Sequence, residues 1–283
     1  MKQKRAAHLF IMTLLVLLIV FVQDGFGQSS LKILLSNDDG IDAPGLAALF
    51  DKLIPLGSVT VAAATKNQSG VSHSIAPEGP IWVSEMEKKG HKWYAIEAPP
   101  ATCVRLALES LLPEKPDIVI AGINKGDTTG VVTYYSATVA CAREAAIAGL
   151  PAIAVHLERG EAMDYEGAAS FIAELVQEIK KKELKSRIFL NICIPSLPKD
   201  RMRGVLITKQ DTRVTQEFYE KKIDPSGKMY FLRSFKRLDP AGEKTDIWAL
   251  RNGYISITPL QFDQTDYAAL KTLESWAAAK WKK

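Results

Sequence analysis

The sequence has few cysteines, and they are spread widely. It holds Cys103, Cys141 and Cys193 among 283 residues, with no closely spaced pair. This argues against a disulfide scaffold and against a cysteine-based zinc site. Each cysteine lies among apolar residues, so we expect three buried free thiols, although a single bridge between two of them stays open. We also find no internal repeat and no low-complexity tract.

Excess charge of one sign is small as well. The chain has 36 Lys and Arg against 32 Asp and Glu, a formal net charge of +4. Part of this excess lies in Lys2, Lys4 and Arg5. Because no basic stripe is interleaved with aromatic residues, the sequence does not predict extended nucleic-acid binding.

One long apolar run stands near the N-terminus. A basic head is followed by the apolar residues 9–22 and then by Gly25-Phe26-Gly27. This layout predicts a signal peptide over residues 1–27, cleaved after Gly27. The run is shorter than the roughly 20 residues that a transmembrane helix needs. We therefore expect an exported protein, periplasmic or secreted, without a membrane anchor after cleavage; an uncleaved N-terminal anchor is the alternative.

The segment from Leu31 to Leu46 predicts a buried strand, a polar turn and a helix. An apolar run ends at Ser36-Asn37-Asp38-Asp39-Gly40, and Pro44 suits the first turn of the helix that follows. Two adjacent carboxylates at the carboxyl end of a strand repel each other unless a cation or a donor lies between them. A divalent metal site is one interpretation; an Asx turn with a helix cap is the other.

Further along the chain, apolar strands alternate with helices. Strands are predicted over residues 58–63, 81–84, 93–96, 117–121, 152–155 and 188–192, with helices from Pro100, from Ser136 and around residues 171–182. This order predicts an α/β fold with a mostly parallel, doubly wound sheet and helices on both faces. We expect one domain over residues 28–283, with its α/β core at about 31–200.

The part from about residue 201 to residue 283 has a different pattern. Short β-runs are predicted over residues 204–208, 229–232, 247–250 and 254–258, and a helix over 266–281. Asn252-Gly253 between two β-runs favours a hairpin. A β-hairpin arm of this kind often pairs with a second copy, so we expect a homodimer or tetramer formed through the C-terminal arm.

Three polar turns call for a common explanation. They carry Asp38 and Asp39, Ser69, and Asn124. Turns after neighbouring parallel strands meet in one crevice, where these side chains would form an all-oxygen ligand set for Mg²⁺ or Mn²⁺. Ser136 and Thr138 at a helix start, with Lys125, add donors and charge suited to a phosphate group.

At these residues the sequence resembles the SurE family of survival-type nucleotidases. The matching segments are residues 34–45, 67–70, 122–126, 135–138 with Glu144, 245–250 and 253–260. The resemblance implies a Rossmann-like core, an arm exchanged between subunits, and metal-dependent hydrolysis of nucleoside 5′- and 3′-monophosphates. It also implies that Asp38, Asp39, Ser69 and Asn124 are the metal ligands, with Asp38 and Asp39 acting in catalysis.

Two residues depart from the pattern of that family. Thr128 stands where a second Asn is expected, and Ala137 where a Gly is expected. Thr128 has fewer donors, and Ala137 disfavours a backbone with positive φ, so substrate range or rate is in question. A broad-specificity exported acid phosphatase and a catalytically weak nucleotide- or phosphate-binding protein are therefore alternative functions. For the nucleophile, a metal-activated water and an Asp carboxylate are both open.

Overall fold

A computed structural model describes the protein over residues 30–182, 187–213, 216–236, 239 and 242–280. The predicted signal peptide lies outside these residues. The chain divides into two units, Met1–Leu31 and Lys32–Lys283, and nearly all of the described residues belong to the second. Within the described ranges, no helix is long and apolar enough to cross a membrane.

In the described part of the chain, nine strands form the central sheet, in the order β3-β4-β2-β1-β5-β6-β7-β11-β8. Their bounds are β1 Leu31–Ser36, β2 Gly57–Ala64, β3 Val83–Lys88, β4 His91–Ile96, β5 Ile118–Lys125, β6 Ala152–Leu157, β7 Ile188–Ile194, β8 Gly204–Ile207 and β11 Tyr254–Gln261. The pairs β2–β4, β1–β5, β5–β6, β6–β7 and β8–β11 are parallel, whereas β3–β4 and β7–β11 are antiparallel. The prediction of a mostly parallel sheet is confirmed.

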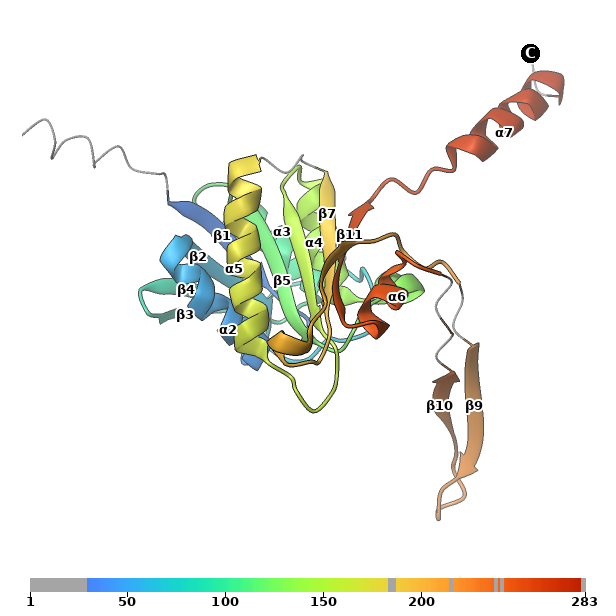
Figure 1. The fold of residues 1–283 in the computed structure, drawn as a ribbon, viewed down its shortest axis with the longest axis horizontal. Coiled ribbons are helices and arrows are strands. Elements are labelled where there is room, and N and C mark those ends of the chain that lie inside the picture. Colours follow the sequence, from blue (N-terminus) through green and yellow to red (C-terminus); the bar gives the residue numbers. More distant parts are fainter. Residues whose placement is uncertain (1–29, 183–186, 214–215, 237–238, 240–241, 281–283) are drawn as a thin grey trace, which may run out of the picture. The chain divides into compact units, whose positions relative to one another are not determined.

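Helices cover both faces of this sheet, as expected. Helices α2 (Pro44–Leu53) and α5 (Tyr165–Lys182) lie on one face, and α3 (Pro100–Leu106) and α4 (Ala137–Ile147) on the other (Figure 1). Two further helices, α6 (Asp246–Arg251) and α7 (Tyr267–Lys280), flank β11 in the sequence. Because both faces are covered, the central strands are mostly apolar: Leu34, Leu35 and Ile120 are fully buried.

The first strand-turn-helix unit shows why its small residues are needed. Pro44 is the first residue of α2, where its missing N–H costs nothing. A Cβ atom on Gly45 would lie 2.1 Å from the carbonyl oxygen of Ile123 in β5. Only glycine therefore allows α2 to approach β5 this closely, and this approach brings the turn after β1 next to the end of β5.

The order of the strands creates a topological switch point at β1. The chain passes from β1 to β2 on one side, and β5 then pairs with the other side of β1. In open α/β sheets, the crevice outside the carboxyl ends of such strands is the usual place for ligands. The turn after β1 and the end of β5 both lie at this crevice.

Three sequence predictions are wrong in detail. Gly122 to Lys125, expected as a polar turn, is the last part of β5, which continues past a register shift between Ala121 and Asn124. Residues 247–250 are helical rather than extended, because Thr245 caps Trp248 and starts α6. Asn252-Gly253 consequently joins a helix to β11 and is not a hairpin turn.

A C-terminal β-hairpin arm is present, as expected, although it lies over residues 216–236 and not at Asn252-Gly253, and the predicted free thiols are confirmed. Strands β9 (Gln216–Ile223) and β10 (Met229–Lys236) pair antiparallel with each other in a sheet of their own. Asp224 closes the turn by accepting hydrogen bonds from the N–H groups of Ser226 and Lys228. All three cysteines are buried and free, and burial raises the pKa of each thiol.

Candidate active site

Asp38 is a buried carboxylate at the switch point. It directly follows β1 and is 2% exposed. The N-terminus of α4 faces it: Thr138 donates its hydroxyl to Oδ1 at 2.5 Å and its backbone N–H to Oδ2 at 3.3 Å. Burial nevertheless raises the pKa of Asp38 to about 6, and the negative charge of Asp39 adds to this rise. The hydroxyl of Thr138, predicted to bind substrate, is thus directed at Asp38.

Asp39 joins the other two predicted loops. Its Oδ2 accepts the backbone N–H of Lys125 at 2.8 Å, and its Oδ1 accepts the side chain of Asn67 at 3.3 Å. Asn67 in turn accepts the N–H of Ser69 at 3.0 Å. The backbone of Asp38 also accepts the N–H of Gln68 at 2.7 Å. The three polar segments therefore meet around the Asp38-Asp39 pair.

Asn124 sits at the carboxyl end of β5, beside this pair in the fold. Its side-chain nitrogen donates to the carbonyl of Gly126 at 2.9 Å and lies 3.2 Å from Nδ1 of His156. His156 is fully buried, and burial lowers its pKa to about 3. The imidazole is therefore neutral at ordinary pH.

The other predicted site residues lie around the same crevice. Ser136 is the N-cap of α4, and its hydroxyl accepts the N–H of Val139 at 3.2 Å, so the predicted helix start is confirmed. Ser69 and the side chain of Lys125 are exposed. Ala137 is the first residue of α4, and its backbone is not in the left-handed region, so its methyl group introduces no backbone strain.

The chemistry of these residues fits a hard divalent cation. Two carboxylates and the neutral oxygens of Ser69 and Asn124 are the donors that Mg²⁺ and Mn²⁺ prefer. Each Asp39 oxygen accepts one hydrogen bond and keeps a lone pair for a metal. Among the described residues, no group of three or more His, Cys, Asp or Glu side chains is placed to hold a metal.

A charged cluster around Glu144, a residue that the resemblance had singled out, anchors the loop of Ser69, although its partners Arg105 and His73 were not predicted. Glu144, on α4, is 4% exposed and accepts hydrogen bonds from Arg105 at 3.0 Å. His73 Nε2 lies 2.7 Å from the same carboxylate. Burial pushes the pKa of Glu144 up, but His73 and Arg105 outweigh it, so the pKa is lowered. The loop is thereby tied to the helix that holds Asp38.

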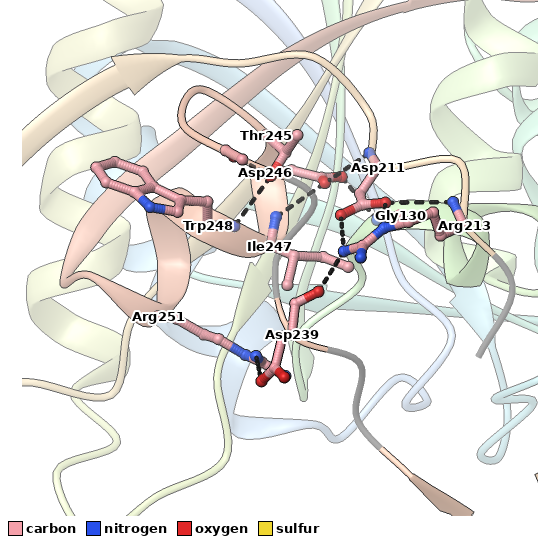
Figure 2. Close-up of polar contacts among 10 residues, drawn as sticks. Gly130, Asp211, Arg213, Asp239, Thr245, Asp246, Ile247, Trp248 and Arg251 are labelled. Carbon is pink, nitrogen blue, oxygen red and sulfur yellow. Dashed lines mark hydrogen bonds and ion pairs between the residues drawn. The ribbon is translucent and has the colours of Figure 1, made fainter. Parts of the chain in front are cut away.

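A second anchor, also missed as a site feature, is the carboxylate of Asp246 at the start of α6. It accepts the backbone N–H groups of Gly130 at 2.7 Å, Asp211 at 2.9 Å and Ile247 at 2.9 Å (Figure 2). Burial raises its pKa, and these three donors oppose that rise. The 245–250 segment, which the resemblance had singled out, therefore holds the loop between β5 and α4 in place.

One cation and one phenol at the rim of the site were also not predicted. Arg159, just after β6, donates Nε to the carbonyl of Lys125 at 3.1 Å. A Cβ atom on Gly126 would lie 3.1 Å from that same Nε, so the glycine makes room for the guanidinium. Burial, and then the charge of Asp39, raise the pKa of Tyr165, while Arg159 lowers it. Arg159 could have been found from the sequence, because it lies just after the strand that neighbours β5 in the sheet.

The fold and site define a class: a Rossmann-like α/β protein with an acidic, oxygen-lined site at the switch point of its sheet. The family model described as Survival protein SurE matches residues 33–217. The chain belongs to the SurE family, and the resemblance seen in the sequence is confirmed.

Relatives and a solved structure agree with this assignment. The chain is 38% identical over 251 residues to the 5′-nucleotidase SurE of Syntrophobacter fumaroxidans, covering 87% of this chain and 99% of that protein. It is 40% identical over 247 residues to the 5′-nucleotidase SurE of Coxiella burnetii, covering 87% and 95%. The crystal structure of the SurE protein from Aquifex aeolicus superposes with a TM-score of 0.77 at 35% identity, covering 86% of this chain and 98% of that one.

The raised pKa of Asp38 predicts a specific dependence of metal-free stability on pH. The folded state holds this proton more tightly than the unfolded state, whose carboxyl has a pKa near 3.8. The contribution of Asp38 is therefore most favourable below about pH 4 and is lost as pH rises through about 6. The loss is on the order of 3 kcal/mol.

Asp38→Asn should remove this loss. With EDTA present, we expect the variant to exceed the wild type in free energy of unfolding by about 1–3 kcal/mol at pH 7.5, with a smaller excess at pH 4. Urea unfolding across this range measures it, and Asp42→Asn, an exposed carboxylate of the same turn, is the matched control. A constant difference between Asp38→Asn and the wild type from pH 4 to 7.5 would contradict the interpretation.

Proposed function

We propose that this chain is a divalent-metal-dependent phosphomonoesterase that hydrolyses nucleoside 5′- and 3′-monophosphates to nucleoside and phosphate. The observation that carries the proposal is the meeting of three loops around Asp38 and Asp39 at the switch point. Membership of a family whose curated relatives are named 5′-nucleotidase SurE supports the substrate class.

In this proposal Asp38, Asp39, Ser69 and Asn124 hold one Mg²⁺ or Mn²⁺. When bound, the cation supplies charge that polarises the phosphoryl group and activates water for attack. Thr138 and the N-terminus of α4 orient the Asp38 carboxylate. The main chain of Lys125 fixes Asp39 in the same way.

The substrate phosphate would meet positive charge at the rim of the crevice. Lys125 and Arg159 are exposed cations beside the turn that carries Asp38 and Asp39. The side chain of Arg159 is aligned by its hydrogen bond to the Lys125 carbonyl. Ser136 lies at the start of α4, whose dipole favours an anion. These groups are suited to neutralising a phosphate during transfer.

Asp39→Asn should abolish most of the phosphatase activity. The change removes one anionic ligand while keeping the shape of the side chain, so we expect at least a hundredfold lower kcat/KM with a nucleoside 5′-monophosphate and Mn²⁺. Phosphate release measures this, and Asp42→Asn, which changes an exposed carboxylate of the same turn, should stay near wild type.

Controls in the same assay separate the alternative functions. EDTA should silence the wild type and added Mn²⁺ should restore it. An equal rate with a simple aryl phosphate would favour a broad acid phosphatase, and tight nucleotide binding without phosphate release would favour a binding protein. Full activity of Asp39→Asn would remove the proposed mechanism.

We further propose that the hairpin β9–β10 joins subunits in a homodimer or tetramer. Alternation along the two strands places Met229, Phe231 and Phe235 on one face, together with Tyr219 and Ile223; the same face also carries the charged residues Lys221, Arg233 and Glu217. All five apolar side chains are at least half exposed. Five exposed apolar side chains on one face of a hairpin that pairs with no other strand in the described part of the chain fit a second copy of the same arm.

Charging this face should break the assembly. For Phe231→Glu with Phe235→Glu, we expect the mass in solution to fall to that of one chain, because four carboxylates would face each other in a dimer. Light scattering after gel filtration measures the mass. Ser234→Glu, which places a charge on the opposite face of β10, should leave the assembly intact. A wild-type protein that is already monomeric would refute the proposal.

We also propose that the protein is exported and matured by cleavage after Gly27. The support is the layout of residues 1–27. Produced in a Gram-negative host, the protein should appear in the periplasmic fraction with a mass that begins at Gln28. Leu15→Arg, which places a charge in the apolar run, should keep the full chain in the cytoplasm. A wild-type chain that starts at Met1 in the membrane fraction would support the uncleaved anchor instead.

A further inference from the structure

The side-chain amide of Asn124 has both of its hydrogens engaged. Its nitrogen lies 2.9 Å from the carbonyl oxygen of Gly126 and 3.2 Å from Nδ1 of His156. An amide nitrogen has two hydrogens to donate and no lone pair to accept with. The two acceptors therefore fix which end of the amide is the nitrogen, and the carbonyl oxygen Oδ1 is directed away from both of them.

The acceptor on His156 requires one tautomer of its ring. Because Nδ1 accepts from Asn124, the ring proton lies on Nε2. Nε2 is buried and makes no hydrogen bond within the described residues, and the same is true of Oδ1 of Asn191. Asn191 interacts with the imidazole from the neighbouring strand β7, and its nitrogen donates to the carbonyl of Thr128 at 2.9 Å. A donor and an acceptor on adjacent strands thus remain to pair with each other.

These residues form a polar row across three adjacent parallel strands. Asn124 in β5 is in register with His156 in β6, and Asn191 in β7 is in register with Ala154, two residues before His156 on the same face of β6. The neighbours of His156 in its strand, Val155 and Leu157, are apolar and buried. Burial of a polar ring in such a strand costs free energy unless its polar atoms are hydrogen-bonded, whereas burial of an aliphatic side chain there is favourable. The presence of a histidine at this position therefore suggests that its ring has a function beyond packing.

We propose that His156 is a positioning residue for the metal ligand Asn124, holding its amide so that the carbonyl oxygen faces the cation. This inference rests on the proposed function, because it takes Asn124 as a ligand. Without His156, the amide loses one of the two acceptors that oppose a flip, and a flipped amide would present N–H groups to a cation. Partners that orient a metal ligand typically change metal affinity by 10–100-fold when removed.

Substitutions of His156 that differ in where they place an acceptor test this inference. His156→Phe keeps a ring of similar size without an acceptor. His156→Asn places an amide oxygen near the position of Nδ1, whereas His156→Gln places it near that of Nε2, away from Asn124. We expect about tenfold or greater loss of Mn²⁺ affinity for His156→Phe and His156→Gln, and recovery to within about threefold of wild type for His156→Asn.

The measurement is titration of the metal-free full chain with Mn²⁺, followed by the EPR signal of the free ion. It uses no substrate, so it is independent of turnover. Urea unfolding of each variant shows whether the fold is retained, and His156→Gln decides the question if His156→Phe does not fold.

A double-mutant cycle shows whether His156 acts through Asn124. In an Asn124→Ala background, His156→Phe should weaken Mn²⁺ binding no further, because the amide that it orients is gone. Wild-type affinity in folded His156→Phe or His156→Gln would overturn the inference, as would equal losses for Asn and Gln at this position. Failure of the wild type itself to bind Mn²⁺ would instead refute the proposed function.

Discussion

The structure of the site depends on one buried carboxylate held at the start of a helix. Asp38 leaves β1 where the N-terminus of α4 is directed at it, and Thr138 binds both of its oxygens. Two hydrogen bonds do not fully offset its burial, since the pKa of Asp38 still rises to about 6. A buried carboxylate of this kind is stabilised by a nearby cation or by hydrogen-bond donors. The donors around the pair Asp38-Asp39 supply part of this stabilisation, and a bound cation would supply the rest.

The surrounding loops are held by anchors remote from the crevice. Glu144 ties the Ser69 loop to α4 through His73, and Asp246 collects backbone donors from three segments. Both anchors are buried carboxylates with several donors, so loss of one partner would leave a charge unpaired in the interior. The loops are thus anchored by buried charges that lie outside the crevice, and such supporting contacts help a site to keep its geometry.

The sequence predicted most of the fold because its strong signals are local. Apolar runs of strand length, Pro44 at a helix start and Ser136 at a cap each act within a few residues; both helix starts and most of the strands are confirmed. Residues 247–250 were predicted wrongly as a strand because the prediction followed their apolar, β-favouring side chains. The hydroxyl of Thr245 instead caps the backbone N–H of Trp248 and so favours a helix. The convergence of the three loops was predictable from the parallel order of the strands. The partners of Glu144 and Asp246, separated by up to 116 residues, were not, because no local pattern specifies them.

The polar row from Asn124 to Asn191 shows how a site can extend into an apolar sheet. Parallel strands buried on both faces favour apolar residues, and each polar residue among them must find its partner on the adjacent strand. Register supplies that partner for Asn124, which faces His156, whereas Asn191 in β7 is in register with Ala154, two residues before His156. A slip of one residue between β5 and β6 would bury an unpaired amide and an unpaired imidazole together. The hydrogen bond that orients the amide of Asn124 therefore also disfavours wrong pairing of β5 with β6. The same contact serves both the proposed metal site and the specificity of the fold.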